Sequence, residues 1–355
     1  MNTNEPVDLV YTWVDDGFPG YRALLEHHSD SAHDRNPNRT RDNLDMLRYS
    51  LRSVHHYLPW IRKIHILSCR PQVPEWLVTN HPRISIVHHD RIMDRAILPT
   101  FNSFAIISHL HLIPGLTRRF LYFEDDMLVA RPFAPEDLMA PDGLIRFYPR
   151  FFSTPGARHR HRKKLSPWNL ALAHTNHLLD GAYGLARRKS VNHVPLFIDA
   201  PAWGAMIDRW AEPFESTRHS RFRAMGNVAP EHLYPYYMVN EGLGQWHTRR
   251  ETYRRSVYLG LENQRWLNAM TLGLHGLRCP MFITMNDNFG RQPNPRAVAH
   301  VRAYLARRFP WPSPFERIEP VYPDEYDLHG LLAGITPENL HTEVNFGPAV
   351  GREEP

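Results

Sequence analysis

Short apolar segments that end in acidic or polar side chains recur through the first third of the chain, and they constrain the fold more than any other feature. The predicted elements, in chain order, are a strand over 7–14, a helix that starts near residue 40 and ends at Leu58, strands over 61–67 and 84–87, a helix over 102–113 and a strand over 120–123. Strands and helices in this order are typical of an open, mostly parallel sheet. The sequence therefore predicts an α/β protein with a Rossmann-like sheet.

Acidic or polar residues follow three of these predicted strands: Asp15-Asp16, His88-His89-Asp90 and Glu124-Asp125-Asp126. Because ligands of open α/β sheets bind beyond the carboxyl ends of the strands, we expect these groups to share one site. Carboxylates there suit a divalent cation beside a diphosphate, and one of Asp125 and Asp126 could instead accept the proton of an attacking hydroxyl. Spacing alone leaves a solvated acidic turn as the alternative.

The same pattern returns late in the chain, where a predicted strand over 281–285 ends at Asn286-Asp287-Asn288. Taken alone, these residues are explained equally well by an Asx-rich turn. The two strand ends together are more informative than either, because both present compact oxygen ligands.

The sequence predicts four parts of different character. They are an N-terminal α/β part over 1–150, a basic loop and helical insert over 151–245 that forms a second lobe, a return to the catalytic sheet over 246–310, and a proline-rich tail over 311–355. Within the insert, a lone histidine such as His193 is usually structural. Arg218, Arg221 and Arg223 either clamp phosphate or lie on a solvated helix face.

Charge and cysteine content narrow the functional classes. The formal charge of +5 comes from 42 basic and 37 acidic residues, which is only mildly basic, and no nucleic-acid partner is predicted. The two cysteines exclude a disulfide framework and favour reduced thiols in a cytoplasm. The first residues lack the apolar core of a signal peptide, and no apolar run reaches the ~18 residues of a membrane span. The basic run 158–164 leaves open a solvated loop or peripheral contact with the inner face of a membrane.

Four ordered blocks carry a resemblance to a known family. They are residues 7–15, a long block from Arg41-Asp42-Asn43 to Glu124-Asp125-Asp126, a block from His193-Val194-Pro195 to Tyr237, and Met285-Asn286-Asp287-Asn288-Phe289. In these blocks the chain resembles the Stealth family, which includes bacterial capsule hexose-1-phosphate transferases and the catalytic subunit of the lysosomal GlcNAc-1-phosphotransferase. The family usually has Asn at the position of Glu124.

The resemblance implies a set of site residues. The catalytic residues that it implies are Asp125, Asp126, His193, Arg223 and Asp287. The substrate-binding residues that it implies are Thr12, Trp13, Asp15, Arg41, Asn43, Arg48, Asn102, Ser103 and Asn288. Asp126 and Asp287 would hold Mg²⁺ (or Mn²⁺).

The resemblance also implies a reaction in capsule polysaccharide biosynthesis. The enzyme would be a sugar-1-phosphate transferase that moves hexose-1-phosphate, with GlcNAc-1-phosphate the expected group, from a UDP-sugar to a hydroxyl of a glycan acceptor. A phosphodiester forms and UMP leaves. Arg223, assisted by Arg48, would grip phosphate oxygens, and His193 or an Asp of the acidic cluster would accept the proton. The alternatives are a metal-dependent glycosyltransferase that releases UDP and a non-catalytic binder of anionic polymers.

Overall fold

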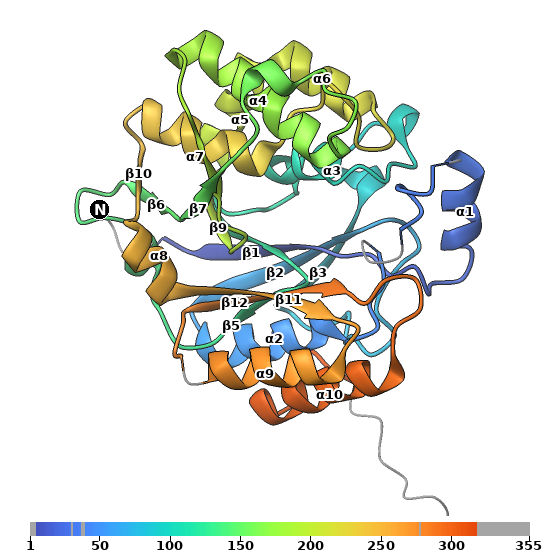
Figure 1. Cartoon of the computed structure of the whole chain (residues 1–355). Coiled ribbons are helices and arrows are strands. Elements are labelled where there is room, and N and C mark those ends of the chain that lie inside the picture. The colour runs from blue at the N-terminus through green and yellow to red at the C-terminus, as the bar shows by residue number, and fades with distance from the viewer. Residues whose placement is uncertain (1–4, 30, 37–39, 277, 318–355) are drawn as a thin grey trace, which may run out of the picture. The chain divides into compact units, whose positions relative to one another are not determined.

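The computed structural model describes residues 5–317 apart from residues 30, 37–39 and 277. Its central sheet contains β1 (Val7–Thr12), β2 (Ile61–Ser68), β3 (Ile84–His88), β4 (Arg119–Glu124) and β9 (Leu196–Asp199). The strand order is β3-β2-β1-β4-β9, in which the first four strands run parallel and β9 runs antiparallel to β4. The predicted α/β class and the mostly parallel sheet are confirmed (Figure 1).

A second, three-stranded sheet holds the late strands of the described chain. β11 (Ser256–Glu262) and β12 (Phe282–Asn288) run parallel, and β12 pairs antiparallel with β5 (Met127–Val129). The sequence predicted that residues 246–310 return to the central sheet, whereas β11 and β12 pair instead with each other and with β5. The apolar pattern of β12 identifies a strand but not its antiparallel partner β5, which lies more than 150 residues earlier in the chain.

The segment 151–245 is only partly helical. Its helices are α4 (Pro167–Tyr183), α5 (Ala200–Arg209), α6 (Ala211–His219) and α7 (Pro230–Asn240), which lie together on one side of the central sheet (Figure 1). Its strands and their partners are β9, β8 (Lys189–Val191) paired with β7 (Pro149–Ser153), and β10 (Gly244–Trp246) paired with β6 (Ile145–Phe147). The predicted insert thus also supplies one strand of the central sheet.

The remaining helices are α1 (Tyr21–His28), α2 (Met46–Tyr57), α3 (Ser103–Ile107), α8 (Arg249–Arg255), α9 (Arg265–Gly276) and α10 (Pro295–Arg308). In Figure 1, α2, α9 and α10 lie on the side of the central sheet that also carries the three-stranded sheet. α3 is shorter than the predicted helix over 102–113, because the chain tightens into a 3₁₀ turn at Leu110–Leu112. Within the described part of the chain, every helix is too short or too polar to cross a bilayer. From residue 318 onward, the predicted tail lies outside the residues that the structure describes.

Burial follows the expected layers. β1 is buried from Val7 to Tyr11, as parallel strands covered on both faces are. The inner face of α2, with Leu47, Leu51 and Val54, packs on the same core. A smaller core between the three-stranded sheet and α10 contains Leu259, Met285 and Val301, among others. The two cores meet around α2, so the second sheet is fixed beside the first.

The carboxylate of Asp8 is fully buried near the start of β1. It accepts hydrogen bonds from Arg62 Nε and Nη2 at 2.8 and 2.5 Å, and from the Thr117 backbone N–H at 3.1 Å. His65 Nε2 lies 3.1 Å from the same carboxylate. Burial alone would raise the pKa of Asp8, but the hydrogen bonds from His65 and Arg62 lower it.

We expect Asp8→Asn to destabilise the fold by about 3 kcal/mol, because the buried partners of the carboxylate lose their charged acceptor. Since the folded pKa of Asp8 is lowered, this stabilisation is fully present above the unfolded pKa of about 3.9 and is lost as the pH falls through the folded pKa. Urea unfolding of both proteins at several pH values measures the difference. Equal stability at pH 7 would contradict the prediction.

Candidate active site

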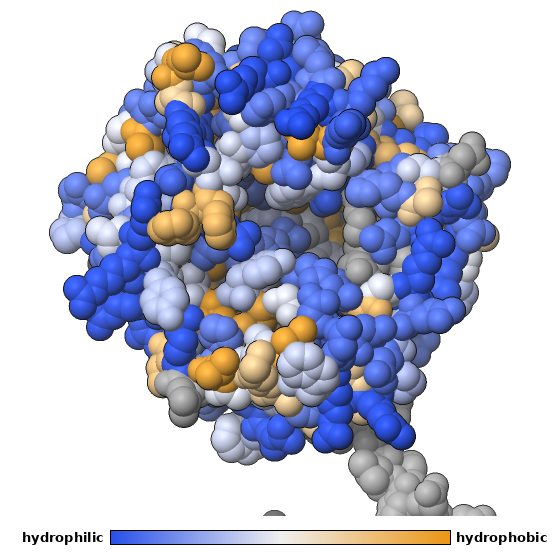
Figure 2. Space-filling view, in the orientation of Figure 1, coloured by the Kyte–Doolittle hydropathy of each residue, from blue (hydrophilic) through white to orange (hydrophobic). Residues whose placement is uncertain are grey.

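The strand order of the central sheet reverses at β1, with β2 and β3 on one side and β4 and β9 on the other. Ligand sites of open α/β sheets form at such a point, beyond the carboxyl ends of the strands. Thr12, the last residue of β1, pairs in register with Glu124, the last residue of β4. A cavity of about 500 Å³ opens at this point and appears as the hollow near the centre of Figure 2.

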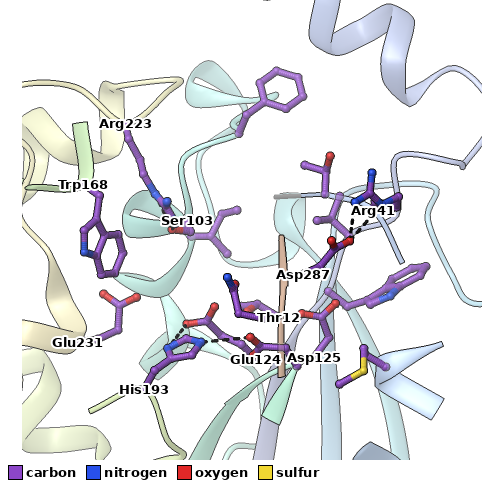
Figure 3. A pocket seen from close by; sticks show the side chains of 18 of the residues that line it. Thr12, Arg41, Ser103, Glu124, Asp125, Trp168, His193, Arg223, Glu231 and Asp287 are labelled. Atoms are coloured by element: carbon purple, nitrogen blue, oxygen red, sulfur yellow. Dashed lines mark hydrogen bonds and ion pairs between the residues drawn. The ribbon is translucent and has the colours of Figure 1, made fainter. Parts of the chain in front are cut away.

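Most of the predicted site residues line this cavity. They are Thr12, Trp13, Arg41, Asn43, Ser103, Asp125, Asp126, His193, Arg223 and Asp287. They come from segments that are far apart in the sequence, and Figure 3 shows how several of their side chains converge. The structure thus places the two predicted acidic strand ends at one cavity.

The acidic cluster forms the tight turn between β4 and β5. Burial and the nearby carboxylate of Asp42 hold the pKa of Asp125 well above its usual range. One oxygen of Asp126, Oδ1, is buried and has no hydrogen-bond partner among the described residues. The backbone N–H of Met285 donates to the Asp126 carbonyl at 3.0 Å, which ties the end of β12 to this turn. The turn therefore presents one buried carboxylate oxygen, Asp126 Oδ1, that has no donor within the described part of the chain.

His193 lies between two carboxylates of this turn. Its Nδ1 is 3.8 Å from Glu124 Oε1, and its Nε2 is 3.4 Å from Asp126 Oδ2. Burial would lower the pKa of His193, but the charges of Glu124 and Asp126 raise it to about 10. One ligand atom from each of these three residues lies within 4.8 Å of the others, a spacing that could hold a metal ion. The order of β4 and β9 explains the position of His193, since the residues just before an antiparallel strand lie beside the end of its neighbour.

Asp287 lines the cavity but is held by a different partner. Arg41 donates to Asp287 Oδ2 from Nη2 at 2.7 Å and from Nε at 3.1 Å. The backbone N–H of Phe289 donates to Asp287 Oδ1 at 2.7 Å. The sequence predicted that Asp126 and Asp287 share a metal, whereas the structure groups Asp126 with Glu124 and His193.

Arg223 projects toward the cavity with its guanidinium group fixed from two directions. Nε and Nη2 donate to Ser103 Oγ at 3.2 and 2.5 Å. The rings of Phe104 and Trp168 lie 4.9 and 5.0 Å from the guanidinium carbon. Burial lowers the pKa of Arg223. A guanidinium held by a neutral hydroxyl and aromatic rings is available to an anionic ligand.

Arg48 and Asn102 do not line the cavity. Arg48 stacks on the Trp76 ring at 4.9 Å, and its Nε lies 3.9 Å from Glu316. Asn102 is fully buried, caps the start of α3 and donates to Asn227 Oδ1 at 2.9 Å. Both predicted substrate contacts therefore make structural contacts instead, and Asn102 joins the loop of Arg223 to α3.

Asp15 and Asn288 also lie outside the cavity lining. Asp15 Oδ1 accepts from the backbone N–H of Gly17 at 2.9 Å and shapes the turn after β1. Asn288 is exposed at the end of β12 and accepts from Asn286 Nδ2 at 3.1 Å. They border the site without facing into it.

The cavity-lining residues that sequence reasoning missed include Trp168 and Glu231. Glu231 is the second residue of α7, and burial together with Glu124 raises its pKa to about 7. Its Oε2 is buried without a hydrogen-bond partner in the described part of the chain. The only sequence signal is a Pro directly before each of these residues, and most proteins use Pro at a helix start for capping alone.

The fold and site define an α/β protein with a carboxylate-rich ligand cavity at the carboxyl edge of a mostly parallel sheet. Two family models match the sequence, described as Stealth protein CR2, conserved region 2, over residues 39–147, and Stealth protein CR3, conserved region 3, over residues 192–240. The chain therefore matches the Stealth family over these two conserved regions. The acidic cluster lies in the first of these regions, and His193, Arg223 and Glu231 lie in the second.

Several curated relatives are named exopolysaccharide phosphotransferases. One from Streptomyces coelicolor is 33% identical over 324 residues, which cover 88% of this chain and 53% of the relative. One from Nocardia farcinica is 33% identical over 319 residues and 61% of its length. CpsY of Mycobacterium tuberculosis is 30% identical over 320 residues and 58% of its length. The chain spans about half the length of the curated relatives it matches.

Solved structures with related architecture are more distant. The galactosyltransferase LgtC, solved with donor and acceptor sugar analogs, is 12% identical with a TM-score of 0.37, over 85% of this chain and 95% of that chain. Mouse xyloside xylosyltransferase 1 is 11% identical with a TM-score of 0.35, over 79% of this chain and 97% of that chain. At these TM-scores the likeness carries no argument about function.

We expect a divalent cation to bind at Glu124, Asp126 and His193. Mn²⁺ binding, followed by electron paramagnetic resonance, should weaken at least tenfold in Asp126→Asn and in His193→Gln, since each removes a ligand. Asp287→Asn should leave Mn²⁺ affinity within about twofold, because Arg41 already pairs with that carboxylate. A strong loss of Mn²⁺ affinity in Asp287→Asn, with none in His193→Gln, would instead support a metal shared by Asp126 and Asp287.

Proposed function

We propose that this chain is a sugar-1-phosphate transferase. It moves hexose-1-phosphate, with GlcNAc-1-phosphate the expected group, from a UDP-sugar to a hydroxyl of a glycan, forming a phosphodiester and releasing UMP. The observation that carries the proposal is one cavity in which Arg223 faces a cluster of Glu124, Asp126 and His193, in a chain that matches two Stealth conserved regions and whose relatives are named exopolysaccharide phosphotransferases.

The roles follow from the two kinds of charge in the cavity. Phosphoryl transfer depends mainly on positioning and on stabilising the charge of phosphate oxygens. A Mg²⁺ (or Mn²⁺) held by Asp126, Glu124 and His193 would supply positive charge beside the diphosphate. Arg223 binds phosphate oxygens from the opposite wall. The nucleotide lies at the end of β1, against Thr12, Trp13 and Asn43, which line the same cavity.

The hydroxyl proton goes to a carboxylate and not to His193. Near neutral pH a His193 with a pKa of about 10 already carries a proton. If it binds a metal, its ring nitrogen is occupied. In neither state can it accept another proton, so an anionic side chain of the cavity is the better base.

The reaction conserves the sugar. The acceptor oxygen forms a bond to the β-phosphorus, and the bond from that phosphorus to the bridging oxygen of the α-phosphate breaks. UMP leaves with the bridging oxygen and its electron pair. The bond between sugar C1 and its oxygen is never broken, so the anomeric configuration is retained.

The released nucleotide tests the proposal. We expect the protein, incubated with Mg²⁺, a panel of nucleotide-sugars and oligosaccharide acceptors, to release UMP. Asp126→Ala should lower turnover by about 10²–10³, a range typical for loss of a charge-stabilising group. Glu136→Gln, which changes an exposed carboxylate away from the cavity, is the matched control.

Two outcomes would contradict the proposal and support another function. Release of UDP would establish an ordinary glycosyltransferase that breaks the sugar C1–O bond. Salt-sensitive binding of anionic polymers without turnover of any nucleotide-sugar would establish a binding protein.

We also propose peripheral association with the anionic inner face of a membrane. The loop residues 161–164 are exposed and basic. A second surface supports the proposal more strongly, because α9 exposes Trp266, Met270 and Leu274 along one face and Arg outnumbers acidic residues over 248–308.

Vesicle binding separates the two surfaces. We expect co-sedimentation with phosphatidylglycerol-containing vesicles that weakens in high salt, and loss of that binding when Trp266, Met270 and Leu274 are all changed to Ser. Changing Arg162, Lys163 and Lys164 to Ser should have the smaller effect, since that loop offers charge without apolar area. Binding that ignores lipid charge and both sets of changes would contradict the proposal.

A further inference from the structure

Two residues of the cavity wall have no role in the reaction described above. Trp168 and Glu231 are each the second residue of a helix, α4 and α7, and each follows a Pro at the helix start. In Figure 3 they lie next to each other on one side of His193 and Glu124. Two separate helices therefore begin at the cavity and present an aromatic ring beside a carboxylate.

One carboxylate oxygen of Glu231 lacks the hydrogen-bond donor that a buried acceptor requires. This oxygen, Oε2, is buried and has no hydrogen-bond partner among the residues that the structure describes. Arg223, a cation of the same wall, directs its Nε and Nη2 to Ser103. Buried oxygens without donors are rare in folded proteins, because each is destabilising. A ligand that brings a hydroxyl group would supply the missing donor.

Trp168 supplies the aromatic surface on which a sugar ring could pack. Its side chain is 36% exposed, although it lines the cavity and packs on Phe104 at 5.1 Å between ring centroids. The C–H groups on one face of a pyranose pack well on an indole, while the hydroxyls at the ring edge need acceptors. An indole beside a carboxylate with one unpartnered oxygen matches both requirements.

In-line displacement determines which sugar this wall meets. The attacking and leaving oxygens lie on opposite sides of the phosphorus. In the proposed reaction the leaving nucleotide lies toward Thr12, with the transferred phosphate beside Glu124 and His193. The attacking hydroxyl must then approach from the opposite side, and Figure 3 shows Trp168 and Glu231 on that side.

We propose that Trp168 and Glu231 form the acceptor subsite, in which Trp168 stacks on a pyranose ring and Glu231 accepts the proton of the attacking hydroxyl. This inference rests on the proposed function. As the acceptor oxygen bonds to the β-phosphorus, its proton passes to the Glu231 carboxylate and the bond to the bridging oxygen of UMP breaks. Glu231 is thus a catalytic residue, and Trp168 binds the acceptor.

Kinetics with separate donor and acceptor titrations test the subsite. The variants are Glu231→Gln, which keeps the shape of the side chain, Trp168→Ala, and Trp168→Phe, which keeps an aromatic ring. We expect Glu231→Gln to lower kcat by about 10²–10⁴. Trp168→Ala should raise the acceptor KM about tenfold, and Trp168→Phe should recover much of that loss. The dissociation constant of UMP, measured by calorimetry, should stay within twofold in all three variants and thereby shows that they fold.

Matched controls are Trp311→Ala and Glu212→Gln, which change an exposed indole and an exposed carboxylate outside the cavity. Unchanged kcat in Glu231→Gln, or an effect of Trp168→Ala on the donor KM alone, would overturn the inference. Release of UDP by the unaltered protein would instead overturn the proposed function, while a raised acceptor KM in Trp168→Ala would still support the subsite.

A binding measurement covers the case in which no acceptor is turned over. Saturation-transfer NMR with the methyl pyranosides of mannose, galactose, glucose and GlcNAc, in the presence of UMP, reports contact directly. We expect at least one of them to bind, and the signal to disappear in Trp168→Ala but not in Trp311→Ala. Absence of binding by all four sugars would also overturn the inference.

Discussion

The buried carboxylate of Asp8 joins β1 to β2 through Arg62 and His65, and to the start of β4 through Thr117. These strands must be in register for the site to form, because Thr12 at the far end of β1 pairs with Glu124 at the end of β4. A shift of one residue in either strand would turn the cavity-facing side chains to the other face of the sheet. One polar cluster at the amino-terminal ends of the strands therefore helps to fix the carboxyl ends, where the ligands bind.

The site concentrates negative charge that the fold does not neutralise. Arg41 pairs with Asp287, and His193 with two carboxylates of the acidic turn, but burial and like charges raise the pKa of both Asp125 and Glu231. Grouping acids in this way is unfavourable for folding unless a ligand compensates. A cation, a phosphate bound through Arg223 and a hydroxyl donor would together satisfy these groups, which is why we relate the arrangement to function.

The sequence predicted those features that depend on residues adjacent in the chain. The apolar run of β4 and its acidic end could be predicted because strand and turn are adjacent in the chain. The apolar part of β12 was predicted in the same way, although Asn286-Asp287-Asn288 belong to the strand itself. The pairing of β12 with β5 could not be predicted, since β5 is distant in sequence and only three residues long. Arg48 and Asn102 were placed in the site by motif resemblance, yet Arg48 packs on Trp76 and Asn102 joins the loop of Arg223 to the start of α3. Trp168 and Glu231 were missed because their role depends on where two helices begin in space.

The direction of β9 brings the two walls of the cavity together. β9 runs antiparallel to β4, with Leu196 opposite Tyr122, so the chain just before β9 lies beside the acidic end of β4. A parallel strand in the same place would put His193 at the opposite edge of the sheet, a strand length away from Glu124. The same segment then continues into α5 to α7, which carries Glu231 to the cavity. The antiparallel edge strand thus explains how an otherwise parallel sheet obtains its nucleotide wall from one part of the chain and its proposed acceptor wall from another.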